Sequence, residues 1–265
     1  MEDSRPARRR FRVANLEAGA AGVVELGAAV VRHLRVLRAA PGDRVRLFDG
    51  EGREVEAEVV ELADHAGRAR ILGAGAAART ESPLRCWLVQ ALPVRQARMD
   101  TIVRQITELG VSRIVPVIAE RSQGGRLGVA ALQRRTDRWR RIADAAAEQC
   151  GRARVPEIDA PCGYDDLDWE GLPRPLFIAT PEPAEPAAAA ADRTTIAATG
   201  SAAGAAGAAA VTLMVGPEGG WSDAELATAA GRGALPIGLG PRILRADTAS
   251  VVAVALLQHR LGDLS

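Results

Sequence analysis

The chain has 265 residues, 48% of them hydrophobic and 25% charged, and its net charge is +1. This composition is typical of a soluble globular protein with one large or two modest domains, and the sequence has neither a long apolar run for a membrane helix nor the apolar core of a secretory signal. Scattered cysteines and histidines give no zinc pattern, so we expect no metal and a reduced cytoplasmic setting, and because every basic residue is arginine, lysine chemistry is excluded.

Residues 8–78 have the pattern of a small β-rich module. Apolar and polar residues alternate over 10–13, and two further strands, 45–49 and 53–61, flank a glycine-rich turn. Between them, residues 28–38 place their apolar side chains at helical spacing. Short strands, tight turns and one helix favour a small barrel.

From residue 84 onward, apolar strands alternate with helices. The sequence predicts strands at 84–92, 114–118, 176–179, 211–215 and 235–239, and helices at 99–109, 130–150, 223–230 and 246–260. This alternation indicates an α/β domain with a mainly parallel sheet. Residues 73–82 are predicted to be a linker, and the Ala/Gly-rich segment 184–210 a flexible surface connection.

A glycine-rich turn, GPEGGWS at 216–222, directly follows the strand at 211–215. Ser222 and Glu225 have the spacing of a capping box, which predicts that a helix begins here. Ligands of open α/β sheets bind at the carboxyl ends of strands, and glycines let backbone N–H groups approach them closely. The turn is therefore a candidate binding site.

A second turn, LGPRILRADTA at 239–249, repeats this architecture after the strand at 235–239. It carries Arg242, Arg245 and Asp247, residue types that recognise anionic or hydrogen-bonding ligands. Pairing of the two arginines with surface acids fits the sequence equally well. A third glycine pattern, 73–78, matches a loose dinucleotide-binding motif, but a strand follows it where that motif needs a helix.

Together the two turns resemble the C-terminal motifs of the bacterial 16S ribosomal RNA (uracil-N3)-methyltransferases, a SPOUT-class family. The resemblance covers nearly the whole chain, through Arg10-Phe11 and the segments at 33–52, 108–111, 120–122 and 138–158. Two departures stand out: Ala246 and Asp247 replace the Thr and Glu of the family's Arg-Thr-Glu-Thr, and Trp221 stands where Phe is usual.

The resemblance implies a PUA-like β-barrel, an RNA-binding module, over 1–78 and a SPOUT α/β domain with a C-terminal trefoil knot over 79–265. It implies S-adenosylmethionine as cofactor, no metal, and a homodimer that methylates N3 of a uridine in 16S rRNA or the small ribosomal subunit. N3 must lose a proton and leave its base pair for this reaction. A SPOUT ribose 2′-O-methyltransferase and a non-catalytic ribosome-assembly protein remain alternatives, whereas a dinucleotide oxidoreductase rests on 73–78 alone.

The resemblance also gives roles to individual residues. Arg245 and Asp247 are expected to orient or deprotonate the uracil, with Glu218 as the next acid. Four arginines are expected to grip RNA phosphates: Arg9, Arg10, Arg121 and Arg152. The cofactor is expected to contact Ala179, Thr180, Gly216, Pro217, Glu218, Gly219, Gly220, Leu239, Ile243 and Leu244.

Overall fold

The computed structural model describes residues 9–16, 22–74, 80–122, 128–181 and 210–264. The chain divides into two compact units, Met1–Glu81 with Asp144–Val155, and Ser82–Ala143 with Pro156–Ser265. The predicted domain boundary between residues 78 and 79 lies outside the described residues and stays a prediction. The Ala/Gly-rich segment 184–210 also lies outside them, except for its last residue.

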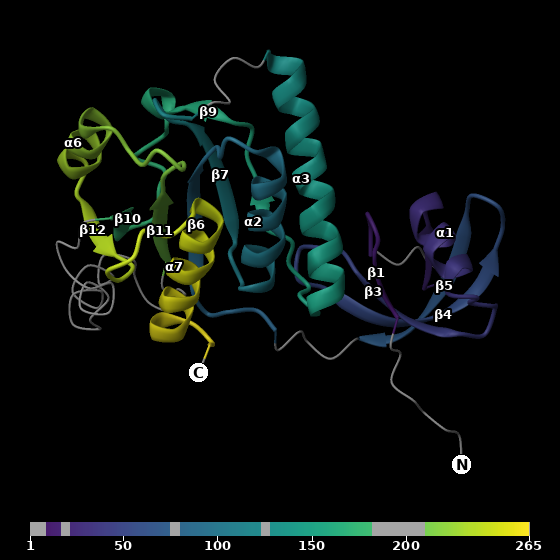
Figure 1. The fold of residues 1–265 in the computed structure, drawn as a ribbon. Coiled ribbons are helices and arrows are strands. Elements are labelled where there is room, and N and C mark those ends of the chain that lie inside the picture. The colour runs from purple at the N-terminus through teal and green to yellow at the C-terminus, as the bar shows by residue number, and fades with distance from the viewer. Residues whose placement is uncertain (1–8, 17–21, 75–79, 123–127, 182–209, 265) are drawn as a thin grey trace. The chain divides into compact units, whose positions relative to one another are not determined.

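The first unit contains a five-stranded sheet in the order β1-β3-β4-β5-β2 (Figure 1). Its elements are β1 (Arg10–Arg12), β2 (Val23–Leu26), α1 (Ala28–Val36), β3 (Arg44–Phe48), β4 (Glu54–Leu62) and β5 (Gly67–Ala74). Strands β3 and β4 form an antiparallel hairpin, and Gly50 and Gly52 in its turn have φ angles of 86° and 114°, which favour glycine. The predicted β module is confirmed, as a sheet with β1 and β2 at its two ends.

Two details of this unit differ from the sequence prediction. Strands β2 and β5 were not predicted, although they pair with each other. Gly73 and Ala74 end β5, so the first residues of the expected linker belong to the sheet. The core of this unit is apolar and includes Phe11, Leu34 and Leu47.

The second unit contains a parallel sheet in the order β12-β10-β11-β6-β7-β8, with β9 beside β7. Its strands are β6 (Arg85–Ala91), β7 (Arg113–Ile118), β8 (Glu157–Ile158), β9 (Cys162–Gly163), β10 (Leu176–Thr180), β11 (Ala210–Val215) and β12 (Ala234–Gly238). Its helices are α2 (Gln96–Glu108), η2 (Tyr164–Asp166), α6 (Asp223–Gly231) and α7 (Ala246–Leu261), and α3 (Val129–Cys150) contributes to both units. The predicted α/β domain is confirmed; β8 and β9 are too short to leave a periodic signal.

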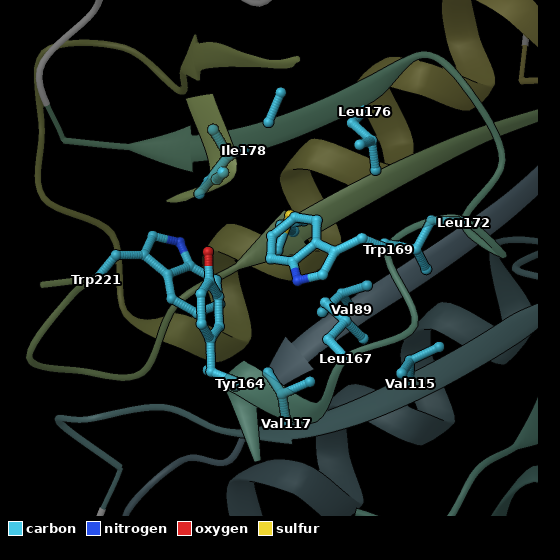
Figure 2. Packing of buried hydrophobic residues seen from close by; sticks show 14 of the residues in the cluster. Val89, Val115, Val117, Tyr164, Leu167, Trp169, Leu172, Leu176, Ile178 and Trp221 are labelled. Carbon is cyan, nitrogen blue, oxygen red and sulfur yellow. The ribbon is translucent and has the colours of Figure 1, made fainter. Parts of the chain in front are cut away.

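Side chains alternate between the two faces of this sheet. On one face, Val89, Val117 and Ile178 pack in a buried cluster with Tyr164 and Trp221 (Figure 2). On the other face lie α2 and α7, which contact each other (Figure 1). Both faces are covered, which explains why the strands of this unit are almost continuously apolar.

None of the helices in the described ranges has the length and apolar character that crossing a membrane requires. Nor do these ranges bring three or more His, Cys, Asp or Glu side chains together in a way that would hold a metal ion.

Candidate functional site

Three neighbouring parallel strands place the two sequence motifs at one edge of the sheet. Strand β10 pairs with β11 on one side and with β12 on the other. Because these strands run in the same direction, the segments that follow their carboxyl ends lie together. We call Gly216–Trp221, after β11, the glycine loop, and Leu239–Arg245, after β12, the arginine loop.

These two loops and the end of β10 enclose a pocket with an empty volume of about 640 Å³, its open mouth included. The pocket is lined by Ala179, Thr180, Pro181, Val215, Gly216, Pro217, Glu218, Gly220, Trp221, Leu239, Gly240, Arg242, Ile243, Leu244, Ala246 and Ala249. The chain therefore brings the two motifs into one cavity.

Among the residues expected to contact the cofactor, Gly219 alone does not line this pocket. It faces the other way, since a Cβ atom built on it would lie 3.2 Å from Cβ of Arg121. The sequence prediction omitted several residues that line the pocket. Each lies close in the chain to a predicted residue, and this position could have identified it. They are Pro181, Val215, Trp221, Gly240, Arg242, Ala246 and Ala249.

The two residues expected to act on the base lie beside the pocket and do not line it. Arg245 is exposed and occupies the N-cap position of α7. Asp247 is in the first turn of this helix, half-buried, and its Oδ1 accepts a hydrogen bond of 3.1 Å from the backbone N–H of Thr248. The arginine that does line the pocket is Arg242, whose role the sequence had left open.

The glycine loop is fixed from two sides by charged hydrogen bonds. On one side, Glu218 accepts bonds from Nη1 of Arg98 (2.6 Å) and from the backbone N–H of Val94 (3.0 Å). On the other side, Nη1 of Arg121 donates to the carbonyl oxygens of Gly219 (2.9 Å) and Trp221 (3.2 Å). These bonds come from the protein's own side chains and hold the loop in one conformation, which favours ligand binding by preorganisation.

The predicted capping box at the start of α6 is confirmed. The Oγ atom of Ser222 accepts from the backbone N–H of Glu225 (3.3 Å), and Oε2 of Glu225 accepts from the N–H of Ser222 (2.8 Å). The other oxygen, Oε1, accepts from the N–H of Glu120 (2.8 Å), which ties the segment after β7 to the glycine loop.

A buried polar pair lies beneath the pocket. Gln90, at the end of β6, is fully buried, and its Oε1 accepts a 2.5 Å hydrogen bond from the hydroxyl of Ser250 in α7. Its Nε2 donates to the carbonyls of Ala91 (2.9 Å) and Val215 (3.4 Å). Val215 immediately precedes the glycine loop, and Ser250 belongs to α7, which follows the arginine loop. Gln90 bonds both residues and so connects the bases of the two loops.

An aromatic cluster packs against the end of the glycine loop through Trp221 (Figure 2). The ring centroids of Trp221 and Tyr164 are 5.5 Å apart, and those of Tyr164 and Trp169 are 5.4 Å apart. The Tyr164 hydroxyl donates to the carbonyl of Glu225 (2.7 Å), and burial raises its pKa well above the ordinary value. Nε1 of Trp221 is buried without an acceptor among the described residues.

Two of the four arginines expected to grip RNA phosphates have little exposed side chain, since Arg152 is buried and the side chain of Arg10 is 9% exposed, and both are bonded within the fold. Nε of Arg10 donates to Glu54 (2.7 Å), and its two Nη atoms donate to the carbonyls of Ala147 and Arg152 (2.8 and 2.6 Å). Arg152 is 4% exposed, and its guanidinium bonds Glu81. Donors used inside the fold are not available to phosphates, so these arginines stabilise the first unit.

Of the other two arginines, Arg9 is half-buried and Arg121 is exposed, and they belong to different units. Arg9 has a side chain that is 36% exposed, with Nη1 3.5 Å from Asp43, in the first unit. Arg121 is exposed in the second unit, where one of its nitrogens holds the glycine loop.

The pocket fits the methyl donor that the sequence resemblance implies. Gly220 and Gly240, one in each loop, have φ angles of 70° and 97°, and a Cβ atom on either would meet no other atom within 4 Å. Each glycine thus leaves space for a ligand against the backbone. The remaining lining is mostly apolar with few polar groups, which suits an adenine ring and the methylene groups of the methionine portion.

Comparisons with known proteins agree with this geometry. Residues 80–258 match the family model of the RNA methyltransferase domain, and residues 26–74 match that of the RNA methyltransferase PUA domain. The chain is 34% identical over 228 residues to the ribosomal RNA small subunit methyltransferase E of Synechocystis, an alignment that covers 86% of this chain and 69% of the relative.

Two solved structures are similar over nearly their whole length. One is the ribosomal RNA small subunit methyltransferase E of Neisseria gonorrhoeae bound to S-adenosyl methionine (33% identity, TM-score 0.80, covering 97% of this chain and 99% of that one). The other is a putative methyltransferase of Legionella pneumophila in complex with the same cofactor (31% identity, TM-score 0.82, covering 96% and 98%).

Proposed function

The chain belongs to the RNA methyltransferase family of ribosomal RNA small subunit methyltransferase E, and from this we propose that it methylates N3 of a uridine in 16S ribosomal RNA. It is an S-adenosylmethionine-dependent methyltransferase of small-subunit ribosomal RNA. The observation that carries the proposal is the single pocket that the glycine and arginine loops form at the edge of the parallel sheet. The uracil atom is the finer part of the proposal, and it rests on the sequence resemblance.

Bound S-adenosylmethionine supplies an electrophilic methyl group on its sulfonium. The glycine loop and Gly240 offer backbone N–H groups and space, and Trp221 and Leu244 offer apolar walls. We assign contact with the cofactor to the expected residues that line the pocket, which are all of them except Gly219. Gly219 is assigned a supporting role, because it positions the loop against Arg121.

The acceptor atom defines what the remaining residues must do. N3 of uracil lies on the Watson–Crick edge and carries a proton, so the base must leave its pair and the proton must be removed. Arg245 and Asp247 lie beside the pocket at the start of α7, where they reach a base that enters from outside. In the proposal Asp247 accepts the proton and Arg245 stabilises the charge that develops on the uracil oxygens.

Positioning accounts for most of the expected rate enhancement. Holding two reactants in line contributes roughly 7–11 kcal/mol toward lowering a barrier. The bonds of Arg98 and Arg121 to the glycine loop, and the Gln90–Ser250 pair near it, supply the rigidity that this needs.

We assign RNA binding to the PUA domain, with a domain division at 1–78 and 79–265. Arg9, which is half-buried, and Arg121, which is exposed, keep their proposed phosphate contacts. A homodimer in the bacterial cytoplasm, and a trefoil knot formed by the C-terminal segment, complete the proposal. Residues 182–209, which precede β11, lie outside the described residues.

The experiment is nucleoside analysis by mass spectrometry of small-subunit RNA incubated with the protein and S-adenosylmethionine. The substrate comes from a strain whose corresponding gene is deleted. We expect N3-methyluridine to appear, and none to appear without protein. Ribose 2′-O-methylation would instead identify the alternative methyltransferase. Binding of RNA and cofactor without any methylated nucleoside would identify a non-catalytic assembly protein.

A further inference from the structure

The two charged side chains that line the pocket differ in whether another group of the protein neutralises their charge. Glu218 and Arg242 are the only two charged residues among those that line it. The carboxylate of Glu218 is compensated by Arg98 and by the N–H of Val94. The guanidinium of Arg242 is exposed and has no hydrogen bond or ion pair with the residues that the structure describes.

The pocket therefore presents one uncompensated positive charge, on the arginine loop. A positive charge attracts an anionic group and repels a cationic one. S-adenosylmethionine carries two cationic groups, the sulfonium and the ammonium, and one anionic group, the α-carboxylate. Of these three groups, the carboxylate is the one that Arg242 favours.

The guanidinium geometry supports the same group. Arginine presents parallel N–H donors that match the two oxygens of a carboxylate. Arg242 also follows Gly240 and Pro241, so its position is set by a turn whose glycine has a φ of 97°. A contact at this end of the ligand would fix the amino-acid portion and direct the methyl group.

We propose that Arg242 binds the α-carboxylate of S-adenosylmethionine and makes the pocket specific for a methyl donor that carries this group. The proposal rests on the proposed function, because it takes S-adenosylmethionine as the ligand of the pocket. Arg242 is a specificity residue here; Arg245, three residues further on, does not line the pocket and provides a matched control with the same charge.

The test compares the binding of two ligands that differ by the carboxylate alone, S-adenosylmethionine and its decarboxylated analogue, by isothermal titration calorimetry without RNA. The wild-type protein should bind S-adenosylmethionine about tenfold more tightly than the analogue, the effect of one charge-assisted contact. Arg242→Ala should lose this preference while binding the analogue as the wild type does, which also shows that the pocket is intact. Arg242→Lys should keep part of the preference.

Arg245→Ala removes the same charge from the same loop, and it should keep the full preference for S-adenosylmethionine. If Arg242→Ala kept the preference as well, the proposal would be overturned. If it kept the preference and bound 16S RNA more weakly, Arg242 would be assigned to an RNA phosphate instead. A wild-type protein that binds neither ligand would overturn the proposed function itself, whereas a wild type that binds both ligands equally overturns only the carboxylate contact.

Discussion

Nη1 of Arg121 lies 2.9 Å from the carbonyl oxygen of Gly219, and the absence of a side chain on this glycine allows the approach. A Cβ atom at Gly219 would be 3.2 Å from Cβ of Arg121 and 3.4 Å from its Cδ. This contact lies on the side of the glycine loop away from the pocket. Gly219 therefore shapes the cofactor site through Arg121.

Gly219→Val should weaken S-adenosylmethionine binding at least tenfold, because the added methyl groups push the loop away from Arg121 and change the pocket wall. Isothermal titration calorimetry measures this directly. Wild-type affinity in the variant would show that the position of Gly219 does not matter for the cofactor.

The same contact predicts that the two residues are energetically coupled. In an Arg121→Ala background, Gly219→Val should cost somewhat less affinity than in the wild type, because Cγ and Cδ of Arg121 are removed and only its Cβ stays near the added side chain. Residues in direct contact typically couple by about 0.5–3 kcal/mol. If the losses of affinity caused by the two substitutions simply added up, the valine would weaken binding through direct contact with the ligand and not through Arg121.

Ser250→Ala should destabilise the protein by about 1–3 kcal/mol, because it leaves Oε1 of Gln90 buried without a donor. The free energy of unfolding is measured by urea denaturation, which is followed by the fluorescence of the tryptophans in the second unit. Gln90→Leu should cost less, since the single proton of the Ser250 hydroxyl can then turn to the carbonyl of Ala246, 2.8 Å away.

The double variant, Gln90→Leu with Ser250→Ala, removes both polar partners and should recover part of the stability lost in Ser250→Ala. A double variant less stable than either single variant would contradict the account of an unsatisfied acceptor.

Arg9 and Arg10 are neighbours in sequence but should respond to alanine substitution in opposite ways. Arg10→Ala leaves Glu54, whose side chain is 6% exposed, without its 2.7 Å partner and should destabilise the protein by about 3 kcal/mol. Arg9→Ala removes a half-buried side chain whose 3.5 Å ion pair with Asp43 is open to solvent, so stability should change by less than about 1 kcal/mol. The same substitution should lower the slope of log K against log salt for RNA binding by about one unit. Thermal denaturation and RNA titration at several salt concentrations separate the two; a stable Arg10→Ala protein would reverse the assignment.

The sequence predicted the elements whose pattern is local. The hairpin of β3 and β4, the five main strands of the parallel sheet and the capping box at Ser222 all follow from spacing within a few residues. The pocket was predictable because parallel strands bring the segments after them to one edge.

What the sequence did not reveal depends on residues that are far apart along the chain. Arg10 lies in an arginine-rich stretch that resembles an RNA-binding segment, yet its partners are 44, 137 and 142 residues away. Similarly, no local pattern distinguishes Arg242 from Arg245, because only the fold decides which of them lines the pocket.

The most direct test of the central claim is a crystal structure of the protein with S-adenosylhomocysteine, the product of methyl transfer. The account predicts the ligand between Gly216–Trp221 and Leu239–Leu244, with its sulfur facing the start of α7, where Arg245 and Asp247 lie. Ligand bound at any other place, with the space between the two loops filled by solvent, would contradict it.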